Sequence, residues 1–193
     1  MILCDRHIET AIQKGRFVID PPPSPSQYDS SSLNLRVGDD FVRWRHELRT
    51  TEGITHNIQL DNISLDNRLH LTGPLQVNAD GTVTVPPGAF VWVRTYEYIH
   101  LPIKSKRAAR VEGRSQQARL GMGVHITAPT IHSGFRGKIV LEIVNHGPFH
   151  LHIQPNKSRL CQLIFEQVDA VPTRGGSTTF SNQATPLGTP RSR

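Results

Sequence analysis

Residues 113–145, GRSQQARLGMGVHITAPTIHSGFRGKIVLEIVN, form the stretch that decides the fold. The stretch opens on a polar turn with two arginines. It ends on residues 138–145, where isoleucine, valine and leucine surround a single glutamate. A run this rich in β-branched residues favours a strand. The small and polar residues before it indicate a turn that leads into a short helix near 115–121.

Further strand signals lie on the N-terminal side of that stretch. Residues 32–37, SLNLRV, alternate polar and apolar side chains as a half-buried strand does. DG at 80–81 and PPG at 86–88 are turn signals, and the apolar run after the second turn ends at Pro102. Many short strands without βαβ alternation predict a mainly β domain, built as a sandwich, barrel or jelly roll. The other expected strands are 41–44, 89–101, 137–145 and 160–168.

One further helix is expected near the N-terminus, over residues 5–15. Asp5 suits the N-cap, and Gly15 can end the helix. An apolar stripe lies between them, made of Ile8, Ala11 and Ile12. The prolines that follow within residues 20–32 cannot continue a helix.

Length and composition limit the organisation of the chain. A sequence of 193 residues suits one domain, which we expect at 1–172. Residues 173–193 shift to Gly, Ser, Thr, Pro and Arg and are expected to form a flexible tail, while residues 45–80 indicate short strands and loops. The apolar runs fall short of the roughly 20 residues of a membrane helix, and the N-terminus lacks a secretory pattern. A cytoplasmic protein is therefore expected.

The net charge and the cysteines narrow the possible partners. A formal charge of +6 and a pI near 9.8 indicate an anionic partner, which leaves nucleotides, nucleic acid and acidic surfaces open. Cys4 and Cys161 lie far apart, which predicts neither a disulfide framework nor a structural zinc site. Zinc nucleobase deaminases need a C-x-x-C pair, and this sequence has none. We interpret His150 and His152 as surface histidines rather than metal ligands.

Residues 113–119 are a candidate phosphate-binding turn. They place two guanidinium groups, a hydroxyl and two side-chain amides within one short segment. Such groups are the positive, directional donors that a triphosphate needs. A solvated loop can carry the same residues, so the pattern alone leaves both interpretations open.

Glu142 is the candidate catalytic group. It is a lone carboxylate in an apolar strand, and a buried carboxylate is costly unless it is paired or hydrogen-bonded. One interpretation is a general acid and base in a desolvated site. The other is a structural glutamate that faces water, lies at a subunit interface or pairs with a core arginine.

Taken together, several segments resemble the dCTP deaminase branch of the dUTPase-like superfamily. Their order and spacing carry the resemblance, and the stretch 113–145 is its strongest part. The matching segments are residues 1–5 (MILCD), 31–38 (SSLNLRVG), 113–115 (GRS), 118–121 (ARLG), 124–128 (VHITA), 134–137 (GFRG) and 140–142 (VLE).

The resemblance implies a distorted β-barrel or jelly-roll subunit that assembles as a homotrimer with active sites between subunits. It implies deamination of dCTP to dUTP and ammonia without zinc, with Mg²⁺ carried by the triphosphate. Glu142 matches the catalytic residue that takes a proton from the attacking water. Ser115 and Arg119 match residues that position this water and the glutamate.

The same resemblance implies a set of substrate-binding residues. The turn after Gly113 matches the phosphate-binding element, the backbone at 126–128 matches the part that reads the pyrimidine edge, and Gln183 is the best tail contact in a possible lid. Residue by residue, the expected substrate contacts are Arg114, Gln116, Gln117, Ala118, Ile126, Thr127, Ala128, His132, Val140, Leu141 and Gln183.

Three positions depart from the family pattern and keep other functions open. Gln116 replaces a usual serine, Thr130 stands where many members carry arginine, and His132 replaces an aspartate that holds the sugar 3′-hydroxyl. A dUTP diphosphatase or a bifunctional enzyme that also hydrolyses dUTP to dUMP is the first alternative. A non-catalytic nucleotide-binding or nucleic-acid-binding protein is the second, although no nucleic-acid recognition motif is visible.

Overall fold

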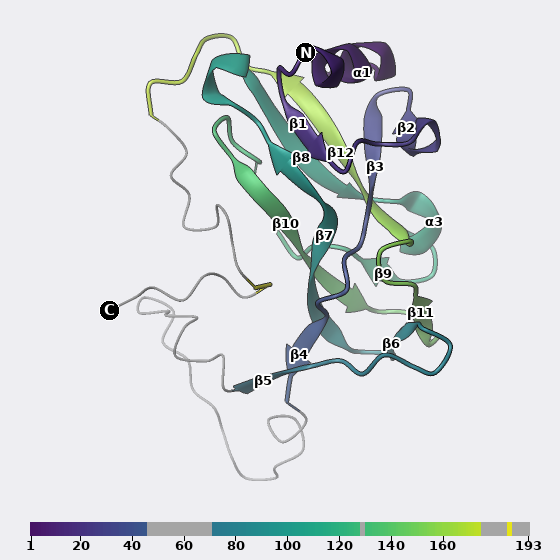
Figure 1. Ribbon diagram of the computed structural model, residues 1–193. Helices are drawn as coiled ribbons and strands as arrows, with labels where there is room; N and C mark the ends of the chain where they lie inside the picture. Colours follow the sequence, from purple (N-terminus) through teal and green to yellow (C-terminus); the bar gives the residue numbers. More distant parts are fainter. Residues whose placement is uncertain (46–70, 128–129, 175–184, 187–193) are drawn as a thin grey trace.

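The computed structural model describes residues 1–45, 71–127, 130–174 and 185–186 (Figure 1). Within these residues the fold is mainly β with few helices, as the sequence predicted. The elements are α1 (Asp5–Gln13), β1 (Val18–Asp20), η1 (Pro25–Gln27), β2 (Tyr28–Asp29), β3 (Ser32–Arg36), β4 (Val42–Trp44), β5 (Thr72–Pro74), β6 (Val83–Val85), β7 (Phe90–His100), η4 (Ile103–Ser105), β8 (Arg107–Gly113), α3 (Ser115–Ala118), β9 (Met122–Gly123), β10 (Arg136–Asn145), β11 (Leu151–Ile153) and β12 (Arg159–Gln167).

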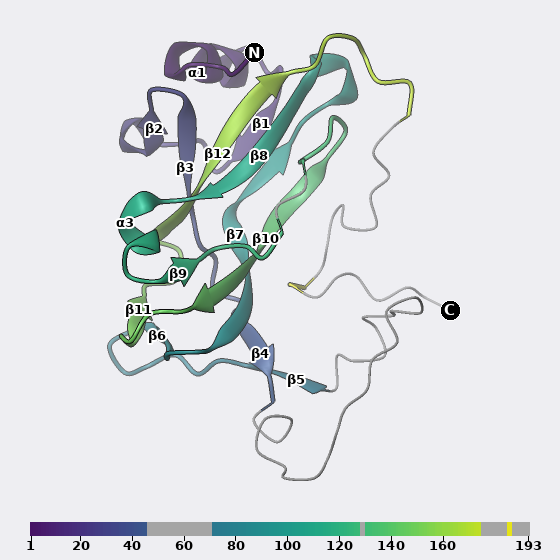
Figure 2. The same cartoon turned by 180° about the vertical axis from the view of Figure 1, so that it is seen from behind.

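Two larger sheets enclose one hydrophobic core. The first has the order β5-β4-β7-β10-β9, with β1 also paired to β7, and the second has the order β2-β3-β12-β8. A third, two-stranded sheet joins β11 to β6. Figure 2 shows the second sheet from the opposite side, with α3, β9 and β11 gathered at one flank. The core is filled from both larger sheets, among others by Val91, Val93, Leu141 and Ile143 from the first and Leu33, Leu35, Leu163 and Phe165 from the second.

The N-terminal helix is confirmed, but its cap lies one residue earlier than predicted. Cys4 is the N-cap, and its carbonyl accepts from the N–H groups of His7 and Ile8. Asp5 is instead the first helical residue, where its negative charge suits the positive end of the helix. Gly15 follows the C-cap with φ +63°, a conformation that favours glycine.

The prediction of a half-buried strand at 32–37 was wrong about burial. All of β3 up to Leu35 is buried, because the polar side chains find partners inside the protein. Ser32 Oγ donates to Gln162 Oε1 at 3.0 Å, and Asn34 Nδ2 donates to Asp29 Oδ2 at 2.7 Å. These hydrogen bonds offset part of the cost of burying polar groups, although Asn34 Oδ1 is buried without a hydrogen-bond partner among the described residues.

Residues 107–120 also differ from the prediction. The sequence predicted no strand there, whereas residues 107–113 form strand β8, paired along its length with β12. The short helix exists as α3 and is a single turn. The turns at Gly81 and Gly88 are confirmed, each glycine having a positive φ, and β7 ends before Pro102 as expected.

Two predictions fall largely or wholly outside the described residues. The region 45–80 is described only at Arg45 and from residue 71 onward, where β5 is one of the short strands expected there. The tail 173–193 is described only at 173–174 and 185–186. Across the described residues, no helix has the length and apolar character needed to cross a membrane.

Candidate active site

Glu142 lies in the middle of β10, on the face that points away from the core. Burial alternates along this strand, so Leu141 and Ile143 enter the core and are fully buried, while Glu142 between them is half-buried. This alternation follows from the two-residue period of a strand. The pairing of β10 with β7 then sets the neighbours of the carboxylate.

Two backbone N–H groups orient the Glu142 carboxylate. Its Oε2 accepts from the N–H of Ile126 at 3.1 Å and more weakly from that of Thr127 at 3.4 Å. The N–H of Glu142 in turn donates to the carbonyl of Val124 at 3.1 Å, which holds the segment against the strand. The backbone expected to read the pyrimidine edge therefore lies directly beside the expected catalytic carboxylate.

Trp92 forms an aromatic neighbour of Glu142 that the sequence did not reveal. The two residues are paired across β7 and β10, and directly paired residues project their side chains on the same side of a sheet. Trp92 is itself packed edge-on by Trp44 and Phe90, with ring centroids 4.8 Å and 4.6 Å away, and it is only 9% exposed. The carboxylate thus lies beside an aromatic cluster whose central ring is largely covered.

A second glutamate, Glu97, is fully buried. Its oxygens accept from Gln27 Nε2 at 3.0 Å, from Arg36 N at 2.9 Å and from Arg36 Nε at 2.7 Å. The Arg36 guanidinium also lies 4.3 Å from the centre of the Tyr96 ring. Three donors and complete burial leave Glu97 no access to a substrate, so it is a structural group.

The predicted phosphate turn, residues 113–119, runs from the last residue of β8 through α3 to the residue after it. The carbonyl of Arg159 accepts from Arg114 Nη1 at 3.2 Å and from Gln117 Nε2 at 3.3 Å. Ser115 and Arg119 are exposed, as are Gln116 and Ala118. The turn therefore presents a hydroxyl and a guanidinium to the outside while its other side is fixed to the start of β12.

A close backbone contact fixes α3 relative to β10. A Cβ built on Gly147 would lie 2.0 Å from the Leu120 carbonyl oxygen, and one on Gly121 would lie 2.3 Å from Gly147 N. Gly121 also has φ +86°, and its carbonyl accepts from His146 N at 2.8 Å. Only glycine leaves room for the turn after α3 to dock on the turn after β10.

Within one chain, the described residues bring together some of the predicted site and leave other parts separate. Glu142 meets Ile126 and Thr127, but no hydrogen bond or ion pair joins it to Ser115 or Arg119 in the described part of the chain. Ala128 and Gln183 lie outside the described residues.

The remaining predicted contacts fall on different surfaces. Val140 lies two residues from Glu142 on the same face of β10, whereas the Leu141 side chain faces the core, so only its backbone is available to a ligand. His132 is exposed in the turn before β10. Ser133, which the sequence did not single out, is buried and donates to the Arg107 carbonyl at 2.6 Å, which anchors that turn.

Possible metal ligands are scattered in the described part of the structure. No group of three or more His, Cys, Asp or Glu side chains is placed there to hold a metal ion. His150 and His152 are both exposed, as interpreted from the sequence, and His152 Nδ1 lies 3.3 Å from Thr84 Oγ1.

The site residues that the sequence did not reveal depend on contacts between distant segments. Trp92 lies beside Glu142 only because of the β7–β10 register, and Arg159 receives Arg114 and Gln117 only because β12 begins beside α3. Trp92 is one of four aromatic residues in β7, so the local sequence did not single it out. No local signal was present for Arg159.

Comparisons with known proteins show to which family the chain is related. A sequence profile of the dCTP deaminase-like family matches residues 2–168. The chain is 38% identical over 165 residues to a protein of Methanosphaera stadtmanae named "dCTP deaminase, dUMP-forming", covering 86% of this chain and 78% of that protein. It is 33% identical over 174 residues to the dCTP deaminase of Psychromonas ingrahamii, covering 90% of this chain and 87% of that protein.

A solved structure agrees at the level of the fold. The 2′-deoxycytidine 5′-triphosphate deaminase of Agrobacterium tumefaciens superimposes with a TM-score of 0.60 at 21% identity. The superposition covers 86% of this chain and 47% of that one, so the chain spans about half the length of this relative. With the profile match over most of its length and relatives above 30% identity, the chain belongs to the dCTP deaminase-like family.

Proposed function

We propose that this protein is a dCTP deaminase that hydrolyses dCTP to dUTP and ammonia. Membership of the family supports this reaction. The observation that carries the proposal is the Glu142 carboxylate, half-buried, facing outward and held by two backbone N–H groups. A carboxylate in that setting can exchange protons with a bound water and a pyrimidine ring.

The proposed reaction adds water to C4 of the cytosine ring and expels ammonia, and Glu142 moves the protons for both steps. Glu142 takes a proton from a water molecule, whose oxygen attacks C4 of the cytosine ring, and the proton passes to N3. The second proton of the water then moves through Glu142 to the exocyclic amine. The bond between C4 and this nitrogen breaks, which yields ammonia and the carbonyl group of dUTP.

We infer that the site is completed by a neighbouring subunit of a homotrimer. Ser115 and Arg119 are exposed on α3, and nothing in the described part of one chain bonds either side chain to Glu142. An exposed hydroxyl and guanidinium are suited to meet the carboxylate of another copy, where they would orient the water and the glutamate. The same surface would receive the triphosphate.

We also propose that Mg²⁺ enters with the nucleotide rather than as a resident metal. Mg²⁺ characteristically binds phosphate oxygens and retains several waters. A chelator should therefore weaken dCTP binding reversibly without stripping a metal from the protein. The two free cysteines fit a reducing compartment, and we infer a cytoplasmic location.

Product analysis tests the proposed function. The protein is incubated with dCTP and Mg²⁺, the nucleotides are separated by chromatography, and ammonia is measured in parallel. We expect one ammonia for each dCTP consumed. Release of pyrophosphate from dUTP without any ammonia from dCTP would replace the proposal with a dUTP diphosphatase. Salt-dependent binding to DNA without turnover of either nucleotide would replace it with a nucleic-acid-binding function.

The same chromatogram tests for a second hydrolytic step. The Methanosphaera stadtmanae relative is named as dUMP-forming, whereas the Psychromonas ingrahamii relative is named simply dCTP deaminase. In this chain His132 stands where the sequence resemblance places an aspartate, and an imidazole lacks the negative charge and the two acceptor oxygens with which a carboxylate orients a hydrolytic water. We therefore expect dUTP, rather than dUMP, as the accumulating product.

A further inference from the structure

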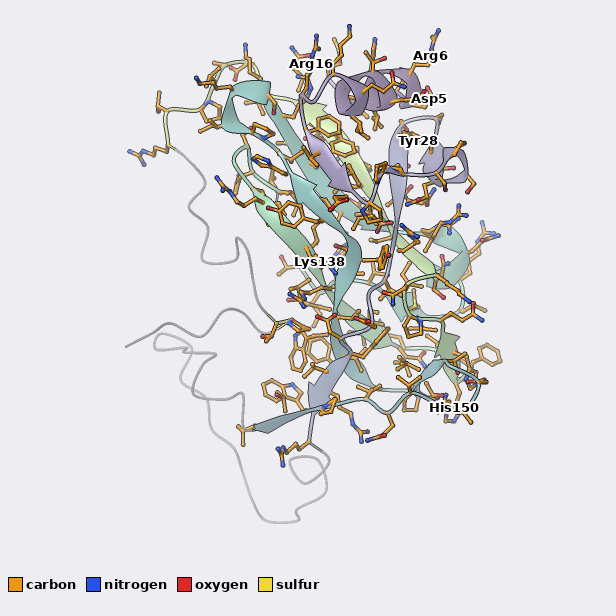
Figure 3. All side chains as sticks on the ribbon, in the orientation of Figure 1. Asp5, Arg6, Arg16, Tyr28, Lys138 and His150 are labelled. Atoms are coloured by element: carbon orange, nitrogen blue, oxygen red, sulfur yellow. The ribbon has the colours of Figure 1, made fainter. Side chains whose placement is uncertain are left out.

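A basic pocket lies on the flank of the molecule formed by α3, β11 and the turn that leads into β12. Its volume is about 480 Å³, which is within the range of small-molecule sites. Leu120, Met122, Leu151 and Leu160 supply apolar surface. Figure 3 shows His150 at this flank, beside β11, and the same elements gather there in Figure 2.

The charged lining of this pocket is entirely basic. Arg114, Lys157 and Arg159 contribute three permanent positive charges, and His150 and His152 add two imidazoles. No aspartate or glutamate is among the residues that line it. A concave surface of one charge sign concentrates ligands of the opposite sign.

The two guanidinium groups are bonded only to neutral acceptors in the described part of the chain. Arg114 donates to the Arg159 carbonyl, and Arg159 donates to the carbonyl and hydroxyl oxygens of Ser26. These bonds orient the side chains without cancelling their charge. Lys157 is exposed and enters no ion pair with a described residue. The pocket is therefore positively charged, and hydrogen bonds hold two of its cationic side chains in place.

The pocket lies behind the surface proposed for catalysis. Arg114, Gln117 and Leu120 line it and recur at intervals of three residues. Ser115 and Arg119 are both exposed, and neither is among the residues that line the pocket. The predicted phosphate turn thus has two faces, and Arg114 and Gln117 belong to the second one.

We propose that this pocket binds the phosphate chain of a nucleoside triphosphate. A linear chain of phosphates matches several fixed cations, because Arg binds phosphate oxygens through a fork of N–H groups and Lys through a point charge. The choice of a nucleotide as the source rests on the proposed function. These phosphates can be those of dCTP itself, reaching past Arg114 from the catalytic side, or those of a second nucleotide.

Binding of inorganic tripolyphosphate to the full-length protein tests this proposal without turnover. Lys157→Gln removes one charge from the pocket, and we expect affinity to fall about tenfold, as loss of one charge-assisted contact implies. Lys157→Arg should retain most of the affinity. Lys14→Gln is the matched control, because Lys14 is an equally exposed lysine on the far side of the fold at the end of α1. If Lys157→Gln binds tripolyphosphate as tightly as the wild type does, or if the wild type does not bind it, the proposed phosphate site is refuted.

Competition with dCTP identifies the source of the phosphate chain. If dCTP displaces tripolyphosphate and Lys157→Gln raises KM without lowering kcat, the pocket holds the substrate's own phosphates. If dCTP and tripolyphosphate bind together and KM is unchanged, the pocket holds the phosphates of a second nucleotide. Because the primary measurement is binding, a protein that binds tripolyphosphate through Lys157 but releases no ammonia from dCTP would refute the proposed function and leave the pocket standing.

Discussion

Two glutamates occupy the middle of long strands in the same sheet, and their surroundings give them different tasks. Glu97 is completely buried and bonded to Gln27 and Arg36, whereas Glu142 is half-buried and bonded only to backbone N–H groups in the described part of the chain. A saturated, covered carboxylate stabilises the fold. A partly open one is available for chemistry.

Stability measurements should separate these two roles. Glu97→Gln leaves the Arg36 charge without its buried partner, and we expect the free energy of unfolding to fall by about 3 kcal/mol. Glu142 lies on the open face, so Glu142→Gln should change the free energy of unfolding by less than about 1 kcal/mol. Urea denaturation of both variants measures the difference. A loss as large for Glu142→Gln as for Glu97→Gln would contradict the assignment.

The two cysteine thiols should also differ sharply. Burial raises the pKa of the Cys161 thiol to about 12, with the Glu97 charge acting in the same direction and Arg114 opposing both. Cys4 is partly exposed at the start of α1, with its sulfur 3.5 Å from His7 Nδ1. At pH 8 a thiol reagent should label Cys4 alone in the native protein and both cysteines in urea. If the native Cys4→Ser variant is still labelled at the wild-type rate, Cys161 is accessible to the reagent.

The sequence singled out Glu142 as the candidate and gave no reason to compare it with Glu97. Both are lone carboxylates in apolar strands, Glu142 within LEI and Glu97 within YEY. What distinguishes them is contact with Gln27 and Arg36, which lie far away in the sequence. A prediction from local pattern has no access to such partners.

At the scale of elements, the contact between Gly121 and Gly147 sets the position of α3 relative to β10. We expect Gly147→Ala to push the turn after α3 away, because its Cβ would lie 2.0 Å from a carbonyl oxygen. The cost should be about 1–3 kcal/mol of stability, as for overpacking elsewhere. Hydrogen exchange should show faster exchange at residues 118–121.

Gly73→Ala is a suitable control for that substitution. The nearest atom to a Cβ at Gly73 is Arg45 Cγ at 3.9 Å, an ordinary van der Waals distance. This variant should exchange at wild-type rates around α3. Equal exchange in both variants would mean that the glycine contact does not hold α3 in place.

Elements with local signals were predicted well, and those defined by their neighbours were not. The α1 helix carries an apolar stripe and a glycine after its last turn, and the two turns carry Gly81 and Gly88, so all three can be recognised in the sequence. Strand β8 was missed because its charged residues and small Ala108 and Ala109 show no clear alternation. The full burial of β3 depends on hydrogen-bond partners supplied by β2 and β12.

At the scale of the whole molecule, the proposed trimer predicts complementation between two inactive variants. Glu142→Gln and Arg119→Ala should each abolish ammonia release when they are alone. If each site takes Glu142 from one subunit and Arg119 from the next, random mixing restores an intact pair in about a quarter of sites. Co-refolded protein should therefore recover about a quarter of wild-type activity. A mixture that stays inactive would place both residues of each site in one chain.

The central claim is that Glu142 relays the protons for loss of ammonia from dCTP. The most direct measurement compares ammonia release and dCTP binding in the wild type and in Glu142→Gln. The side chains are nearly equal in size, so the substitution removes proton transfer and little else. We predict a loss of rate of at least about a hundredfold, with dCTP affinity within a few-fold of the wild type. A Glu142→Gln variant that releases ammonia at the wild-type rate would contradict this account.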